Sequence, residues 1–205
     1  MTLSTQEVIV VDRWSKEGII RAKVNIEAGY TNNPNDLGKE TIWGVTKATA
    51  DEYGYKGAMK DMPQSTAFAI YDKLWWQRMR LDQIMAVSPA LADRMFDFGI
   101  NAGRANCIRE LQRILNVLNR QQKLYGDIDA DGGIGTLTLT ALNGFIKARG
   151  AEGVKRLVFA LGCHQCYYYT DISEKREKNE EFTYGWYDRI YQELPDYAVK
   201  LGICK

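Results

Sequence analysis

The chain has 205 residues, 45% of them hydrophobic, with 27 basic against 26 acidic side chains and a net charge of +1. A chain of this length and apolar content can bury a sizeable core, which excludes an intrinsically disordered protein. The near-zero net charge excludes a molecule-wide field that attracts nucleic acid, so we expect no nucleic-acid partner.

The first elements in chain order are two short helices, near residues 15 to 27 and 46 to 53, with a different kind of segment between them. Residues 28 to 46 are rich in Asn, Gly, Pro and Thr and lack a 3.6-residue period. They predict a small irregular β-hairpin. Phe68, Tyr71 and Trp75 then follow an i, i+3, i+7 spacing, which predicts one shared face of a helix from 65 to 78.

The rest of the chain shows helical periodicity. It predicts helices near 88 to 99, over 103 to 118, from about Thr136, and from just after Gly150, with a polar, Gly-rich loop at 119 to 136. A weakly marked boundary between two regions of the chain falls near residues 100 to 106. No run approaches the 18 apolar residues of a membrane span, so we expect no stable membrane insertion.

The placement of three polar residues indicates glycoside chemistry. Glu27 comes at the end of the first predicted helix, Asp36 follows in the turn-rich segment, and Thr41 comes after it. Hydrolysis of a glycosidic bond needs a proton for the leaving oxygen and a second group that positions water or stabilises positive charge. Residues from a helix and a hairpin can supply these groups from two sides of a bound sugar.

The segment IEAGYTNNPNDLGKETIWGVT resembles the signature of glycoside hydrolase family 108. The matching positions are Glu27, Gly29, Tyr30, Asp36, Gly38, Thr41, Trp43, Gly44 and Thr46. Members of this family are N-acetylmuramidases with a lysozyme-like fold, and many are phage endolysins. The resemblance implies that Glu27 is the catalytic acid, with Asp36 and Thr41 as its partners. Ala28 and Lys39 stand where the family has glycines, and Trp43 where tyrosine is common.

Further segments resemble the same family. YDKLWW (71 to 76) and FDFGINAG (96 to 103) are similar to its later motifs, and LQRILN, DGGIGTLTLTAL and FTYGWYDR resemble the peptidoglycan-binding region that follows. The implied fold is mainly α, a lysozyme-like α+β arrangement with one small β-hairpin and a packed helical C-terminal lobe. The implied lobes are a catalytic one over 1–105 and a peptidoglycan-binding-like one over 106–205.

Several of the candidate site residues also suit a purely structural role. Asp36 also suits a turn, since Asp after Asn-Pro-Asn is a common turn former. Thr41 also suits an ordinary cross-strand position. Glu40 is the second-choice carboxylate for the catalytic role, and we expect it to face solvent.

Aromatic and amide side chains are the candidate substrate contacts. Tyr30 and Trp43 lie nearest the proposed acid in the sequence, so we expect them to stack on sugar rings, whereas core packing is expected for Trp75. Asn101 suits either an acetamido group of the substrate or a loop carbonyl.

The remaining motifs are interpreted as structural. Cys163 and Cys166 form a CxxC, which suits a redox pair or half a zinc site, but no second CxxC exists and His164 is the only histidine. We expect packed structural thiols. Asp127, Asp129 and Asp131 imitate the start of a calcium loop, but Thr138 stands where that loop needs glutamate. We therefore expect no metal and no cofactor.

The sequence therefore predicts hydrolysis of the β-1,4 bond between N-acetylmuramic acid and N-acetylglucosamine in peptidoglycan. A lytic transglycosylase using the same glutamate, and a non-catalytic wall-binding or secretion-associated protein, are the alternatives. The N-terminal residues lack the pattern of a signal peptide. We therefore expect the protein to be made in a host cytoplasm and to reach the periplasm and cell wall through a holin, where it lyses the host. We expect it to be a monomer.

Overall fold

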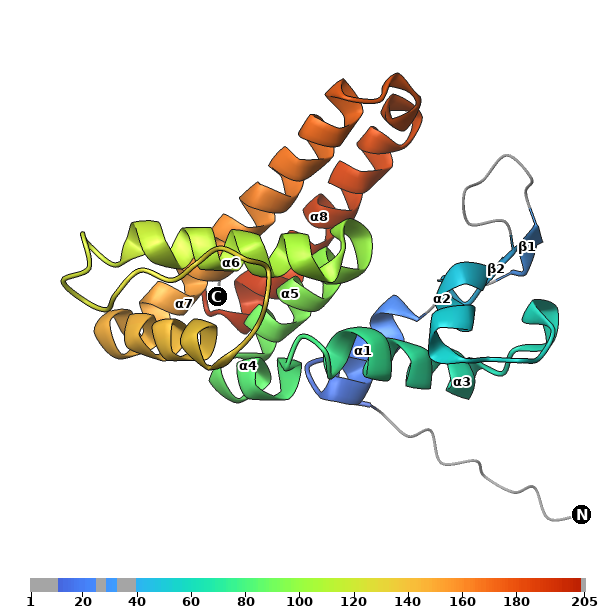
Figure 1. The fold of residues 1–205 in the computed structure, drawn as a ribbon, viewed down its shortest axis with the longest axis horizontal. Coiled ribbons are helices and arrows are strands. Elements are labelled where there is room, and N and C mark those ends of the chain that lie inside the picture. Colours follow the sequence, from blue (N-terminus) through green and yellow to red (C-terminus); the bar gives the residue numbers. More distant parts are fainter. Residues whose placement is uncertain (1–10, 25–28, 33–39, 204–205) are drawn as a thin grey trace, which may run out of the picture. The chain divides into compact units, whose positions relative to one another are not determined.

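The computed structural model describes residues 11–24, 29–32 and 40–203, and the chain divides into two compact units, Met1–Leu74 and Trp75–Lys205. Figure 1 shows the elements of both units, with the α-helices and two of the strands labelled. The first unit contains α1 (Lys16–Lys23), β1 (Thr31–Asn32), β2 (Glu40–Ile42), β3 (Val45–Thr46), α2 (Lys47–Tyr53), the 3-10 helix η1 (Met59–Asp61) and α3 (Gln64–Tyr71).

Local sequence explains both ends of α1. The Ser15 hydroxyl accepts a hydrogen bond from the backbone N–H of Gly18 at 3.0 Å, which caps the first turn. Arg21 and Lys23 occupy the last turn, where the helix dipole favours cations. The helix ends at Lys23 and not at residue 27 as expected, so Glu27 comes four positions beyond its end.

The predicted β-element is present as a small antiparallel sheet in the order β1-β2-β3. Thr41 pairs with both Thr31 and Thr46, and Ile42 pairs with Val45 across a two-residue turn. The sheet therefore has a third strand, β1, beside the single hairpin that the turn residues predicted. The structure confirms a mainly helical fold with one small sheet.

The predicted helix over 65–78 is only partly regular. After α3 the chain forms a π-helix, η2 (Asp72–Trp76). A π-turn inserts an extra residue and so rotates the helix face that follows. Trp76 consequently takes the fully buried position, edge-on to Phe96, whereas Trp75 stays half-buried and donates its indole N–H to the carbonyl of Gly99 at 3.1 Å. The expected core position of Trp75 is therefore wrong by one residue.

The second unit is helical. Its elements are α4 (Leu81–Val87), α5 (Pro89–Ala102), α6 (Arg104–Leu118), α7 (Thr136–Glu174), the 3-10 helix η3 (Glu177–Asn179) and α8 (Glu180–Lys200). Helix α5 is central, because it packs on α4, α6 and α7 and buries 11 of its 14 residues. Ser88 caps it and Pro89 occupies its first turn, as a helix start favours.

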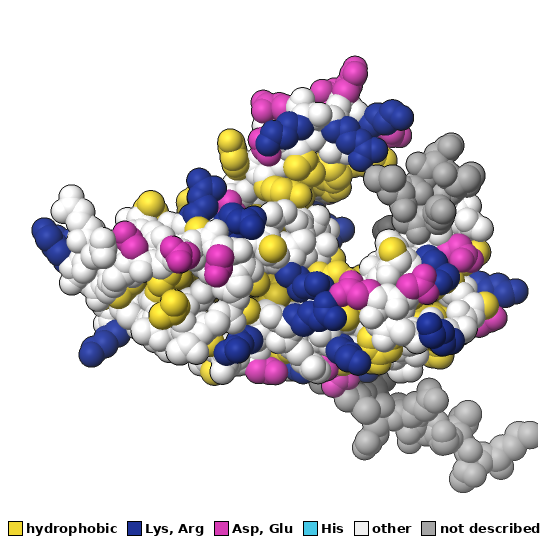
Figure 2. Space-filling view, in the orientation of Figure 1, with side chains coloured by type: hydrophobic (Ala, Val, Ile, Leu, Met, Phe, Trp, Pro, Cys, Tyr) yellow, Lys and Arg dark blue, Asp and Glu magenta, His cyan; other side chains and the backbone are white. Residues whose placement is uncertain are grey.

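Helices α7 and α8 run side by side, joined by η3 (Figure 1). The two helices predicted from Thr136 and from just after Gly150 are both present within α7, which is interrupted where Gly150 leaves helical geometry. The kink is Gly150, at φ +58°. Figure 2 shows hydrophobic side chains on the flank of the α7–α8 pair and charged ones around its tip. Within the described residues, no helix combines the length and apolarity that a bilayer crossing requires.

A buried polar cluster fastens α8 to the rest of its unit. Arg94 of α5 is 2% exposed, donates a hydrogen bond to Gln165 of α7 at 3.3 Å and forms an ion pair with Glu193 of α8 at 3.2 Å. Gln165 in turn donates to Asp97 at 2.8 Å. Tyr197 of α8 donates its phenol to Asp93 at 2.7 Å. Buried charges persist when opposite charges lie beside them, as Glu193 lies beside Arg94.

Candidate active site

The first unit supplies the frame around the predicted acid. Glu27 and Asp36 themselves lie outside the described residues, in 25–28 and 33–39. The described chain ends at Val24, the C-cap of α1, on one side of Glu27 and resumes at Gly29 before β1 on the other. The sequence thus connects both residues to α1 and to the ends of the β1–β2 pair.

The third predicted catalytic residue, Thr41, lies in the middle of the sheet. It is half-buried in β2 and has β1 on one side and β3 on the other. Tyr30, just before β1, is 40% exposed and donates its phenol to Glu40 at 2.6 Å. That bond to a carboxylate raises the pKa of Tyr30. Glu40, expected to face solvent, is thus a partner of the candidate substrate-binding tyrosine.

Trp43 forms the two-residue turn between β2 and β3 together with Gly44. Both have positive φ, 54° and 70°, as a type I′ hairpin turn requires. The indole N–H of Trp43 donates to the carbonyl of Met62 at 2.8 Å, and Tyr71 of α3 donates to the carbonyl of Gly44 at 2.9 Å. The turn that presents Trp43 is therefore held from two other elements of the unit.

Thr46 was matched to the family signature, and its structural role is local. Its hydroxyl oxygen accepts from the backbone N–H of Thr49 at 3.3 Å and caps α2. The block thus combines candidate chemistry, at Thr41, with the start of α2 five residues after β2 ends at Ile42.

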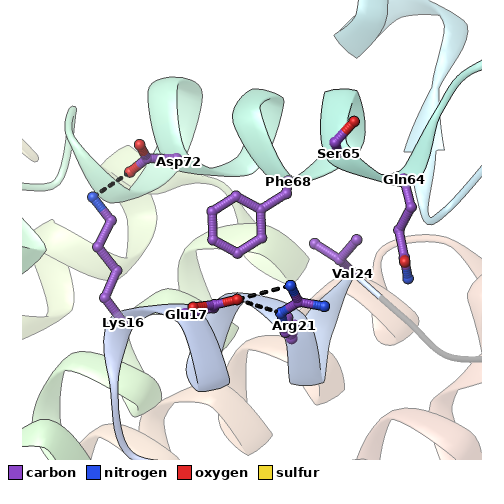
Figure 3. A pocket seen from close by; sticks show the side chains of 8 residues that line it. All are labelled: Lys16, Glu17, Arg21, Val24, Gln64, Ser65, Phe68 and Asp72. Carbon is purple, nitrogen blue, oxygen red and sulfur yellow. Dashed lines mark hydrogen bonds and ion pairs between the residues drawn. The ribbon is translucent and has the colours of Figure 1, made fainter. Parts of the chain in front are cut away.

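A cavity of about 580 Å³ lies between α1 and α3, and we call it the α1–α3 cavity. Figure 3 shows the ring of Phe68 between the two helices, with the Lys16–Asp72 ion pair (2.7 Å) at one end. Arg21 is held by Glu17 at 2.7 Å, and Val24 closes the α1 side. An aromatic ring beside amide, hydroxyl and charged groups is a surface that suits a sugar.

None of the predicted site residues that the structure describes, Tyr30, Thr41, Trp43 and Asn101, lines this cavity, and the sequence places Phe68 only on a helix face. Gln64 and Ser65 also contribute. The signal in the sequence was weak. It consists of the polar residues Gln64 and Ser65, which follow Pro63 on the partly exposed side of α3.

Asn101 belongs to the other compact unit. Its side-chain amide donates to the carbonyl of Asp97 at 2.8 Å and to the Asp97 carboxylate at 3.2 Å, within α5. Neither a loop carbonyl nor a residue of the sheet appears among these partners. Because the amide nitrogen of Asn101 donates to Asp97, the predicted contact with the substrate has to use the amide oxygen.

The motifs set aside as structural have the following surroundings. Cys107 is buried, whereas Cys163 is exposed and Cys166 half-buried, so the expectation of packed thiols is wrong for Cys163. Both lie on one side of α7, three residues apart, in a groove shared with α8. Cys204 lies outside the described residues. Within those residues, no group of three or more His, Cys, Asp or Glu side chains could hold a metal ion.

The loop that resembles a calcium site is held by amides of α6. Gln112, almost fully buried, donates to Asp131, to the carbonyl of Gly133 and to Thr138, and accepts from the N–H of Gly132. The segment DGGIGTLT (131 to 138) is therefore a loop-to-helix junction organised around the side chain of Gln112.

Two family models match the chain in succession. Residues 20–103 match the model described as Glycosyl hydrolase 108, and residues 106–191 match the one described as Predicted Peptidoglycan domain. Among solved structures, SagA of Brucella abortus is similar, with a TM-score of 0.65 and 21% sequence identity over 90% of this chain and 92% of that chain. No curated protein matches. The likeness to SagA concerns the fold.

Proposed function

We propose, from the match of residues 20–103 to the model of glycoside hydrolase family 108, that the protein cleaves the glycan strands of peptidoglycan with Glu27 as general acid. As a muramidase with a peptidoglycan domain, it acts on the β-1,4 bond between N-acetylmuramic acid and N-acetylglucosamine. The observation that carries the proposal is positional. The Glu27-to-Thr46 block lies inside the hydrolase match and directly follows the helix that lines the α1–α3 cavity.

In this mechanism the Glu27 carboxyl donates its proton to the leaving oxygen. Asp36 and Thr41 orient the attacking water or stabilise the oxocarbenium-like transition state. Thr41 suits such a role because backbone pairing on both sides holds its position in the sheet. Tyr30 and Trp43 serve as substrate contacts at the edge of the same sheet. No cofactor takes part in this scheme.

We assign substrate contact to the α1–α3 cavity as part of the same proposal. Phe68 offers a ring face to the C–H side of a sugar, and Gln64 and Ser65 offer hydrogen bonds to its polar substituents. Val24 connects the cavity wall to the segment that carries Glu27.

The biological role that we propose is that of an endolysin. The enzyme is made as a monomer in a host cytoplasm, passes the membrane through a holin and degrades the wall. Expression in a Gram-negative host tests this role. We expect turbidity to fall only after the inner membrane is permeabilised. Lysis without permeabilisation would contradict the need for a holin.

Product analysis tests the reaction. Purified Gram-negative sacculi are digested with the protein, and the soluble muropeptides are identified by mass spectrometry. We expect reducing muramic-acid ends. Anhydro ends would show a lytic transglycosylase, and the absence of fragments would leave a non-catalytic wall-binding protein as the better account.

A further inference from the structure

A second cavity, of about 480 Å³, lies in the second unit and has a composition unlike the first. It is formed by the end of α5, the first turn of α6 and the loop that Gln112 holds. Its walls include Trp75, Arg78, Gly103, Arg104 and Gly132. We call it the arginine cavity. It spans residues of both family matches, which meet at 103–106.

The charge in this cavity is positive. Arg78 and Arg104 are the charged side chains among its described lining residues, and the Arg104 guanidinium lies 5.6 Å from the ring centre of Trp75. The first turn of α6, which starts at Arg104, adds the partial positive charge of a helix N-terminus. Together these features favour an anionic group with an apolar part.

The neighbouring carboxylate, Asp131, is satisfied inside its own loop. It accepts hydrogen bonds from Gln112 at 2.8 Å and from the N–H of Gly133 at 2.7 Å. Those bonds lower its pKa, and Arg109 contributes to the same effect. Arg109 also donates to Asn106, on the wall of the cavity, at 3.0 Å.

The backbone keeps this wall close. Gly132 has a φ of +78°, and a Cβ there would lie 2.7 Å from the carbonyl oxygen of Ala105. Gly103 has a φ of +90° and separates α5 from α6. The loop therefore contacts the start of α6 directly, which fixes the cavity wall on that side.

We infer that the arginine cavity binds the free carboxylates of the peptidoglycan stem peptide, an inference that rests on the proposed function. Guanidinium groups match carboxylates in shape and charge, and two of them select a segment with closely spaced acidic groups. The stem peptide carries such groups on its glutamyl and later residues. Trp75 offers a face for the aliphatic part of the same peptide.

The consequence for catalysis is substrate preference. A strand that bears stem peptides gains contacts that a bare glycan strand lacks. Loss of these contacts weakens binding and leaves the chemical step untouched, so it raises KM and not kcat.

Binding of the sugar-free tetrapeptide L-Ala–D-Glu–diaminopimelate–D-Ala, measured by calorimetry or NMR titration, tests the inference without any hydrolysis. We expect the R78Q/R104Q double variant to bind at least ~10-fold more weakly, the scale of lost charge-assisted hydrogen bonds. The matched control is Arg113→Gln, an exposed α6 arginine paired with Glu110, which should bind like the wild type. Equal affinity in the double variant and the wild type overturns the inference.

Turnover adds a second readout that separates this inference from the proposed function. On intact sacculi the double variant should show a raised KM, and on glycan strands stripped of peptide by an amidase it should match the wild type. Equal losses on both substrates would indicate a general defect and overturn the inference. Should no protein cleave either substrate, the proposed function fails while the peptide titration still decides. The melting temperature of the double variant, compared with that of the wild type, controls for folding.

Discussion

The β2–β3 turn places two consecutive residues at positive φ, and only Gly44 is a glycine. Trp43 is held at φ 54° by the tight turn and by the hydrogen bond from its indole N–H to the carbonyl of Met62. Gly44 has a second constraint, since a Cβ there would lie 2.8 Å from the phenol oxygen of Tyr71. The orientation of Trp43 in the candidate site therefore depends on a residue without a side chain.

Gly44→Ala is expected to destabilise the protein by about 1–3 kcal/mol, because it adds backbone strain and displaces the Tyr71 phenol. Gly185→Ala is the control. Gly185 lies inside α8 with open space around it, where alanine is expected to stabilise by roughly 0.5–1 kcal/mol. Denaturant unfolding of both variants measures the difference. Equal stability of the two variants would contradict the described turn.

At this scale the sequence identifies chemistry better than conformation. Glu27, Asp36 and Thr41 stand out because a spaced signature surrounds them. The turn at Trp43 has no such signal, because type I′ turns favour Asn-Gly or Asp-Gly, and Trp-Gly does not announce a positive φ at its first residue. Tyr30 and Glu40 are ten residues apart, and only the register of β1 on β2 brings them together.

At the scale of elements, α8 depends on a phenol buried against α5. Tyr197 is 4% exposed, donates to Asp93 and has the Arg94 guanidinium 4.4 Å from its ring centre. Burial raises its pKa well above the ordinary value, and the nearby Asp93 charge acts in the same direction. Ionisation of this phenol therefore opposes the docking of α8.

Alkaline unfolding follows from that shift. A phenol in the unfolded chain titrates near pH 10, so the stabilisation is complete below about pH 10 and is lost as pH rises above it. Tyr197→Phe should be less stable at neutral pH by about 1–3 kcal/mol, because Asp93 loses a donor, and should lose less stability between about pH 9 and pH 11. Tyr169, whose pKa burial raises to about 12, accounts for the alkaline loss of stability that remains in this variant.

The control for this experiment is the exposed Tyr184→Phe, which should follow the wild type across the whole pH range. Chemical unfolding at a series of pH values gives the comparison. A Tyr197→Phe variant with the same alkaline loss as the wild type would show that another group is responsible.

Element boundaries were predictable where capping residues mark them. Ser88-Pro89 starts α5 and Gly150 kinks α7, because proline and glycine act through local backbone geometry. The π-helix at Asp72–Trp76 was not predictable. Adding one residue to a turn leaves the apolar spacing intact and changes only which aromatic ring enters the core.

At the scale of the whole molecule, the hydrolase match and the compact units divide the chain differently. The match extends to residue 103 and includes α5, yet α5 packs on α6 and α7 of the following region. Its buried residues therefore need partners from beyond the match. The lobes 1–105 and 106–205 remain a prediction about sequence regions.

A fragment ending at residue 105 tests this interdependence. It retains α5 but lacks α6 and α7, so a large apolar surface becomes exposed. We expect a fragment that aggregates or binds a hydrophobic dye and melts without a cooperative transition, as circular dichroism and size exclusion would measure. A monomeric fragment with a sharp transition would contradict this expectation.

The fold class was predictable as a whole, because helical periodicity dominates the chain and only the segments 28 to 46 and 119 to 136 interrupt it. The α1–α3 cavity was not, since it depends on how two helices far apart in the sequence pack around Phe68. Exposure of Cys163 escaped prediction for the same reason. An apolar helical run does not show which of its residues faces a neighbour.

The most direct test of the central claim is the rate at which Glu27→Gln releases muropeptides from purified sacculi. Glutamine keeps the shape of the side chain but cannot donate the proton, so kcat should fall by at least ~100-fold. The matched control Glu52→Gln, an exposed residue of α2, should stay within about twofold of the wild type. Wild-type rates from Glu27→Gln would contradict the assignment, and a collapse of activity in Glu40→Gln alone would move the acid to Glu40.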